Sequence, residues 1–97
     1  MPEEKKEDNI VFIGIKPFMN YVTSVVMLFT SKNKDEVIIK ARGRWISRAV
    51  EVVEIVRKKF LKEQNIQIKN VQIDSEEVEN EEGRKVNVAS IEITLKK

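Results

Sequence analysis

The chain has 97 residues, of which 41% are hydrophobic and 35% are charged, and a chain of this length holds one small domain with a modest core. Cysteine and histidine are both absent. Their absence excludes disulfides, thiol nucleophiles and zinc sites of the usual kind, and it removes the commonest general base. We therefore expect no enzyme, no cofactor and no bound metal.

The formal net charge is +2, but the charge is distributed unevenly. Residues 1–31 carry a net charge of −1, residues 32–62 carry +6 and residues 63–97 carry −3. A basic middle third suits a surface that binds a polyanion, and it is also what an ordinary solvated helix face would give. No apolar stretch approaches the ~20 residues of a membrane span, and the N-terminus does not resemble a secretory signal, so we expect a cytoplasmic protein without a membrane partner.

The first half of the chain predicts a βαβ unit after a polar tail. Residues 1–8 contain nothing that can be buried, and we expect them to be disordered. The run NIVFIGI at 9–15 is typical of a short buried strand, and apolar residues spaced by three and four after Pro17 predict an amphipathic helix. VIIKA at 37–41 predicts a second buried strand. A strand, a helix and a strand within about thirty residues form a right-handed unit with parallel strands.

Residues 44–62 predict a second helix whose apolar residues cover two sides. One side would pack on the sheet. The other side needs a neighbour that so short a chain does not supply, so we expect a second subunit and a homodimer. Arg57 lies inside the apolar stripe, and we expect it to be paired at an interface rather than freely solvated. The candidate interface residues in this helix are Val52, Ile55, Arg57, Phe60 and Leu61.

Two final strands, at about 65–75 and 84–95, are predicted on either side of the acidic stretch EEVENEEGR, where Gly83 suits a hairpin turn. In both strands the apolar residues change face part-way along. If Ile73 pairs with Val86, both strands change face at the same rung, as a twisted or bulged arm would. The outer apolar residues then need a partner, unless they are ordinary surface residues of a strand.

From residue 9 to residue 97 we thus expect one domain of the α/β class. It is a two-layer sandwich with the order β-α-β-α-β-β, in which two helices cover one face of a mixed four-stranded sheet and the last hairpin projects.

The stretch IIKARGRWIS at 38–47 places cations where the second helix begins. Both strand-to-helix turns of a βαβ unit lie at the same edge of the sheet, so Lys16 is brought toward Lys40, Arg42 and Arg44. Cations at a helix N-terminus are unfavourable until an anion arrives, and phosphate is the anion such sites bind, so we expect contacts with a nucleic-acid backbone. A solvated cationic rim and a small phosphorylated ligand are the alternatives. The candidate contacts here are Lys16, Lys40, Arg42, Gly43, Arg44 and Arg48, with Gly43 allowing close approach.

The carboxylates at 76–82 are the only dense set that a metal-dependent nuclease could use. We expect them at a flexible hairpin tip, which holds no fixed geometry and so argues against catalysis. A protein-interaction module that uses this acidic hairpin to engage basic partners is a further alternative.

The segments NIVFIGIKPFMNYV, VIIKARGRWISRAVEVVEIVRKKFL and GRKVNVASIEITL together resemble the Alba family of small archaeal chromatin and RNA-binding proteins. The resemblance covers nearly the whole chain from Asn9. It implies the fold expected above and a chromosome-associated homodimer that binds double-stranded DNA without sequence specificity, often binds RNA, and packages the genome. Alternatives within this resemblance are a mainly RNA-binding protein, such as an RNA chaperone or a ribonuclease P-type subunit, and a sequence-preferring DNA binder of low affinity.

The resemblance also implies roles for residues outside the basic strand end. Asn20 and Tyr21 match the MNYV segment, where contacts with RNA extend. Phe60 matches an aromatic at which dimers meet side by side on DNA. Arg84, with Lys85 beside it, matches the basic part of a hairpin arm that reaches the minor groove.

Two positions depart from the family pattern. Lys16 matches the second lysine of the usual GKKP turn, but the first is replaced by Ile15, so each subunit should bind one phosphate fewer. Five glutamates at 76–82 would repel phosphates if the hairpin entered a groove, which puts the role of the arm in question.

Overall fold

The structure is a computed structural model that describes residues 8–97. The predicted disordered tail at 1–8 lies outside the described residues except for Asp8.

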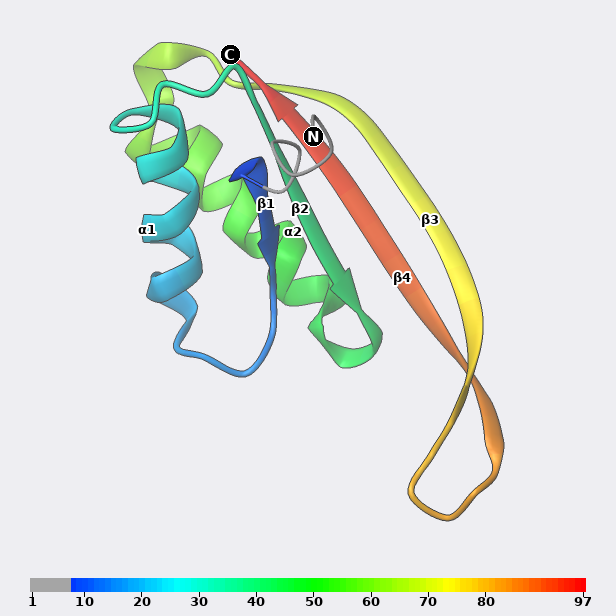
Figure 1. Cartoon of the computed structure of the whole chain (residues 1–97). Helices are drawn as coiled ribbons and strands as arrows, with labels where there is room; N and C mark the ends of the chain where they lie inside the picture. The colour runs from blue at the N-terminus through cyan, green and yellow to red at the C-terminus, as the bar shows by residue number, and fades with distance from the viewer. Residues whose placement is uncertain (1–7) are drawn as a thin grey trace.

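Four strands form one sheet in the order β1-β2-β4-β3 (Figure 1). β1 is parallel to β2, whereas β4 is antiparallel to both of its neighbours, so the predicted mixed sheet is confirmed. The elements are β1 (Ile10–Phe12), α1 (Phe18–Phe29), β2 (Glu36–Arg42), the 3₁₀ turn η2 (Gly43–Trp45), α2 (Ile46–Ile55), the π-helical turn η3 (Val56–Phe60), the 3₁₀ turn η4 (Lys62–Gln64), β3 (Gln67–Glu79) and β4 (Lys85–Lys96).

Both helices pack on one face of the sheet, as expected, and the core lies between the two layers. Strand alternation sends Val37, Ile39 and Ala41 of β2 toward the helices, beside Ile93 and Leu95 of β4. The helices contribute one stripe each, because residues spaced by three and four share a side. The helical core residues are Tyr21, Val22, Val25 and Phe29 in α1, Ala49, Val52 and Val53 in α2, and Val56 and Leu61 after it.

The end of the second helix differs from the expected α-helical spacing. The Leu61 amide donates to the Val56 carbonyl at 2.8 Å, a bond across five residues that widens the last turn. Leu61 therefore takes the buried place above Val56, and Phe60 is turned outward with 51% of its surface exposed. Val52 and Leu61 face the chain's own core, so the expectation that they lie on a partner-facing surface was wrong.

The hairpin is longer than predicted, and its register was predicted wrongly. Val86 pairs with Val78, and Ile73 pairs with Ile91, because β3 continues as a strand through Glu79. A β-bulge between Ile68 and Asn70 absorbs the change of parity in β3, so Ile68, opposite Leu95, and Val71, opposite Ile93, lie on the same face of the sheet, and the predicted change of face in β3 was wrong. The hairpin projects well beyond the helices and twists (Figure 1).

Candidate nucleic-acid interface

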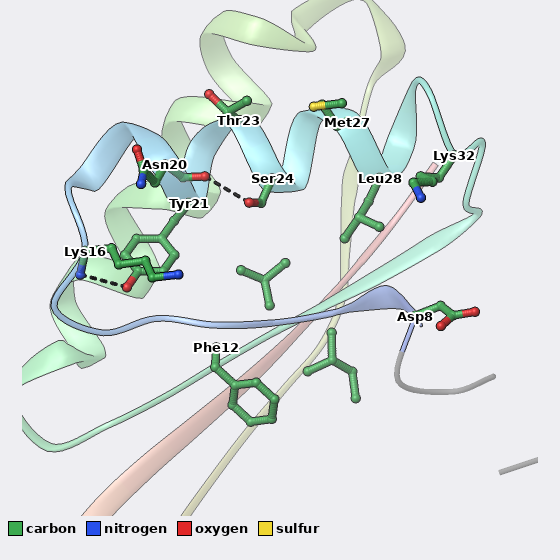
Figure 2. Close-up of a pocket in the computed structure, with 12 residues that line it drawn as sticks. Asp8, Phe12, Lys16, Asn20, Tyr21, Thr23, Ser24, Met27, Leu28 and Lys32 are labelled. Atoms are coloured by element: carbon green, nitrogen blue, oxygen red, sulfur yellow. Dashed lines mark hydrogen bonds between the residues drawn. The ribbon is translucent and has the colours of Figure 1, made fainter. Parts of the chain in front are cut away.

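One side chain joins the two strand-to-helix turns. The Nη1 atom of Arg48 donates to the Gly14 carbonyl at 3.1 Å and to the Lys16 carbonyl at 2.6 Å. The same loop is fixed from α1, because the Lys16 amide donates to the buried Tyr21 hydroxyl at 3.0 Å (Figure 2). The loop that carries Lys16 is thus held against the first turn of α2.

Trp45 holds two guanidinium groups at this edge. The Cζ atom of Arg44 lies 5.0 Å from the centre of the Trp45 ring, and that of Arg48 lies 5.2 Å from it. Such cation–π contacts restrict a flexible cation without neutralising it. We call Lys16, Arg44, Trp45 and Arg48 the loop edge. Within residues 8–97, no carboxylate lies within ion-pair distance of its three cations.

Gly43 makes the turn from β2 into this edge. Its φ of +60° lies in the left-handed region that glycine adopts without strain. A Cβ at this position would meet Val88 at an ordinary contact distance of 3.7 Å, so backbone conformation rather than space explains the glycine.

Lys40 and Arg42 do not join the loop edge. They alternate with the buried β2 residues and therefore lie on the sheet face opposite the helices. Lys40 Nζ is 3.8 Å from Glu92 of β4, and Arg42 Nη1 is 3.5 Å from Glu76 of β3. The expectation of four cations on one rim is corrected to two sets, because cross-strand pairing brings carboxylates to one of them. In both pairs the side chains are 37–57% exposed, and such ion pairs contribute little, so phosphate can replace the carboxylates.

Asn20 and Tyr21, the predicted RNA contacts, have different environments. Tyr21 is buried, and its hydroxyl holds the Lys16 loop, so its ring packs and is not open to stacking. Asn20 is exposed, and its backbone carbonyl accepts a hydrogen bond from the Ser24 hydroxyl at 2.9 Å (Figure 2).

The hairpin arm, residues 74–90, is dominated by acidic residues. Glu76, Glu77 and Glu79 belong to β3 rather than to a flexible tip, which corrects the expectation that they lack fixed geometry. Arg84 follows the turn, where the Asn80 side chain accepts the Arg84 amide at 2.9 Å, and Lys85 begins β4. Among the described residues, neither cation lies within ion-pair distance of a carboxylate.

Arg57 is paired as expected, but within its own chain. It donates to Glu54 at 2.6 Å and to the Ile66 carbonyl at 3.1 Å. The hydrogen bond from Arg57 holds the pKa of the Glu54 carboxyl below its ordinary value. Ile55 is half-buried beside Arg57, so Ile55 and Phe60 are the apolar candidate interface residues that reach the surface.

No group of three or more acidic side chains in residues 8–97 is arranged to hold a metal ion. No helix among these residues is long and apolar enough to cross a membrane.

Comparison with known proteins identifies the family of this chain. The family model named Alba matches residues 9–75. The chain belongs to the Alba family. Two archaeal relatives are both named "DNA/RNA-binding protein Alba". The protein from Methanococcus maripaludis is 48% identical over 93% of this chain and 99% of its own length. The protein from Methanocella arvoryzae is 53% identical over 94% of this chain and 92% of its own length.

Solved Alba structures share the fold. Alba from Thermoplasma volcanium matches with a TM-score of 0.83 and 47% identity over 92% of this chain and all of its own. ALBA1 from Trypanosoma brucei matches with a TM-score of 0.67 and 27% identity over 93% of this chain and 69% of its own. The Alba resemblance seen in the sequence motifs is thereby confirmed.

Sequence reasoning missed the carboxylate partners of Lys40 and Arg42. Glu92 could have been found from the strand register, since it lies directly across from Lys40. Glu76 lies in β3, two strands from Arg42 and two residues beyond Asp74, which shares the Arg42 row, so finding it requires the correct hairpin pairing.

Proposed function

We propose that this protein is a dimeric architectural protein that binds double-stranded DNA through backbone phosphates, largely without sequence specificity. The observation that carries the proposal is the loop edge, where Arg48 holds the Lys16 backbone and lies with Arg44 on Trp45. None of these three cations has a carboxylate partner within residues 8–97. Unneutralised cations next to helix N-termini attract a phosphate strongly.

Phosphate binding at the loop edge is favoured over recognition of base sequence. The three cations belong to loops and a first helical turn rather than to a helix face or ribbon that could enter a major groove. Lys40 and Arg42 supplement them once phosphate displaces Glu92 and Glu76. The exposed arm cations Arg84 and Lys85 and the exposed amide of Asn20 are further candidate contacts.

Apolar surface supports the homodimer. Val71 and Ile73 lie on the helix-side face of the sheet, opposite Ile93 and Ile91, yet 51% and 76% of their surfaces are exposed. Val50 and Phe60 on the second helix are 44% and 51% exposed. Exposed apolar residues at this density are typical of an interface. A two-fold dimer would double the loop edge, and Phe60 could serve contacts between dimers on DNA.

In the cell, we propose a cytoplasmic, chromosome-associated protein that contributes to packaging and also binds RNA. No enzymatic role is proposed. The family relatives named as binding both DNA and RNA support the second ligand. A mainly RNA-directed function is the second candidate.

The test is a set of binding isotherms on two unrelated duplexes of equal length at two salt concentrations, with the oligomeric state measured by ultracentrifugation. We expect equal affinities for both duplexes and a steep loss with salt, because several counterions are released. Strong discrimination between the duplexes, or an affinity that does not depend on salt, would refute phosphate binding. A monomer that binds fully would refute the dimer.

A further inference from the structure

We propose that the uncovered face of the sheet carries a stacking site for an unpaired nucleobase, centred on Phe12. This inference rests on the proposed nucleic-acid binding, but it concerns a different ligand form and a different surface from the loop edge.

Phe12 is an aromatic side chain that the fold leaves exposed. It alternates with the buried Val11 in the edge strand β1, so it lies on the sheet face opposite the helices, and 66% of its surface is exposed. No element within residues 8–97 covers this face. An exposed aromatic ring on an open sheet is the feature on which single-stranded nucleic acids stack their bases.

Polar groups that match a nucleotide lie beside the ring. Strand register sets Phe12 opposite Lys40, Lys40 opposite Glu92 and Glu92 opposite Gln72, in one row across the sheet. The Lys40 ammonium lies 5.8 Å from the ring centre, and Lys40, Arg42, Glu76 and Glu92 line a hollow next to Phe12. These four charges cancel, so the hollow carries no net formal charge while its carboxylates remain in place. It offers donors and acceptors for the polar edge of a base.

Phe12 also borders a second hollow, between β1 and α1, which supplies a place for the backbone. Lys16 lies at one end of this hollow and Lys32 at the other, with Asp8 on the Lys32 side, and Asn20, Thr23 and Ser24 line its α1 side (Figure 2). A strand that places a base on Phe12 can therefore set a neighbouring phosphate near Lys16. Phe12 thus borders both hollows, the one without net charge beside Lys40 and the one that contains Lys16 and Lys32.

Duplex DNA cannot use this ring. The flat faces of paired bases are stacked inside the helix, and only their edges and the backbone are accessible. Phe12 should therefore contribute to the binding of single strands and loops and leave duplex affinity unchanged.

The test compares Phe12→Leu with the control Met19→Ala, which removes an exposed apolar side chain of α1 that is 47% exposed. Affinities are measured by fluorescence anisotropy for a duplex DNA and for an unstructured single-stranded RNA of about 12 nucleotides, a length that such surfaces accommodate. We expect Phe12→Leu to weaken RNA binding about five- to tenfold, with duplex affinity unchanged, because a stacked base is lost. Met19→Ala should change RNA binding less than twofold, roughly the error of such measurements. Phe12→Trp keeps an aromatic ring and should bind RNA as the wild type does.

Single-stranded DNA of the same sequence should show the same loss, since stacking uses the base and not the sugar. An unchanged RNA affinity in Phe12→Leu, an equal loss in Met19→Ala, an equal loss on duplex DNA, or a loss confined to one sugar would each overturn the site. If wild-type protein binds duplex DNA but no single strand, the site is wrong and the proposed function stands. If it binds neither, the proposed function fails first.

Discussion

The loop edge and the hairpin arm carry opposite charge and are held in opposite ways. At the loop edge, hydrogen bonds and one aromatic ring hold Arg44 and Arg48, and the backbone that carries Lys16 is hydrogen-bonded to Arg48 and Tyr21. In the arm, residues 74–85 contain six acids against two bases and lie beyond the helices (Figure 1). Phosphate affinity should therefore reside in the body of the molecule, and the arm should limit it.

The largest effect is expected from removing charge at the loop edge. Lys16→Ala combined with Arg44→Ala should weaken duplex binding more than about tenfold at low salt and reduce the salt slope by about 0.9 for each phosphate that the variant no longer neutralises. Lys59→Ala combined with Lys62→Ala, at the far end of the second helix, removes the same charge as a control. Equal losses of affinity in the two variants, measured by isotherms at several salt concentrations, would mean that net charge alone governs binding.

Neutralising the arm should have the opposite effect. Replacing the five glutamates at 76–82 with glutamine removes repulsion near a bound backbone and should raise duplex affinity roughly tenfold at low salt. Titration of the same duplex with both proteins provides the measurement. An unchanged or lower affinity would show that the charge of the arm does not limit duplex binding.

A smaller effect should follow from loosening the cations without removing them. Trp45→Leu abolishes both cation–π contacts, each worth about 0.5–1 kcal/mol at exposed sites, and should weaken duplex binding about threefold with an unchanged salt slope. Trp45→Phe should recover most of the affinity. Trp45 is the only tryptophan of the chain, so its fluorescence should respond directly to DNA in the wild type. A reduced salt slope in Trp45→Leu would show that the variant neutralises fewer phosphates, and not merely that its cations are less well held.

Breaking the ion pair between Glu76 of the arm and Arg42 of β2 should have a modest effect on duplex affinity. Glu76→Gln frees Arg42, and because exposed ion pairs contribute about 0.2–1 kcal/mol, duplex affinity should rise about twofold. The informative quantity is the double-mutant cycle with Arg42→Ala. Additive effects of the two changes would show that Glu76 does not compete with phosphate for Arg42.

The smallest effect is on stability and lies away from both regions. The pKa of Glu54 is lowered by the hydrogen bond from Arg57, so ionised Glu54 stabilises the fold above the ordinary glutamate pKa, and this contribution is lost as the pH falls through the lowered value. Glu54→Gln should therefore melt slightly below the wild type at neutral pH and equal it in acid. Thermal melts at both pH values test this, and a difference that persists in acid would assign the effect to packing.

The fold was predictable from the sequence because periodicity reports the environment of each segment. An amphipathic helix fits the spacing of Val22, Val25 and Phe29, and a buried strand fits the run VIIKA. The partners of Lys40 and Arg42 were not predictable, because they depend on the strand register, and β3 continues through glutamates that rarely favour strands. The outward turn of Phe60 required a π-helical turn that no local pattern signals.

This wide turn has a consequence for how the chain tolerates changes in length. Deleting Lys59 would place Leu61 four positions after Val56, so an ordinary α-helical bond could replace the long one and Leu61 would keep its buried place. If a residue is inserted at the same point, no ordinary α-helical hydrogen bond can replace the long one and keep Leu61 buried. The variant that lacks Lys59 should therefore remain folded, with the Phe60 side chain pointing in a new direction.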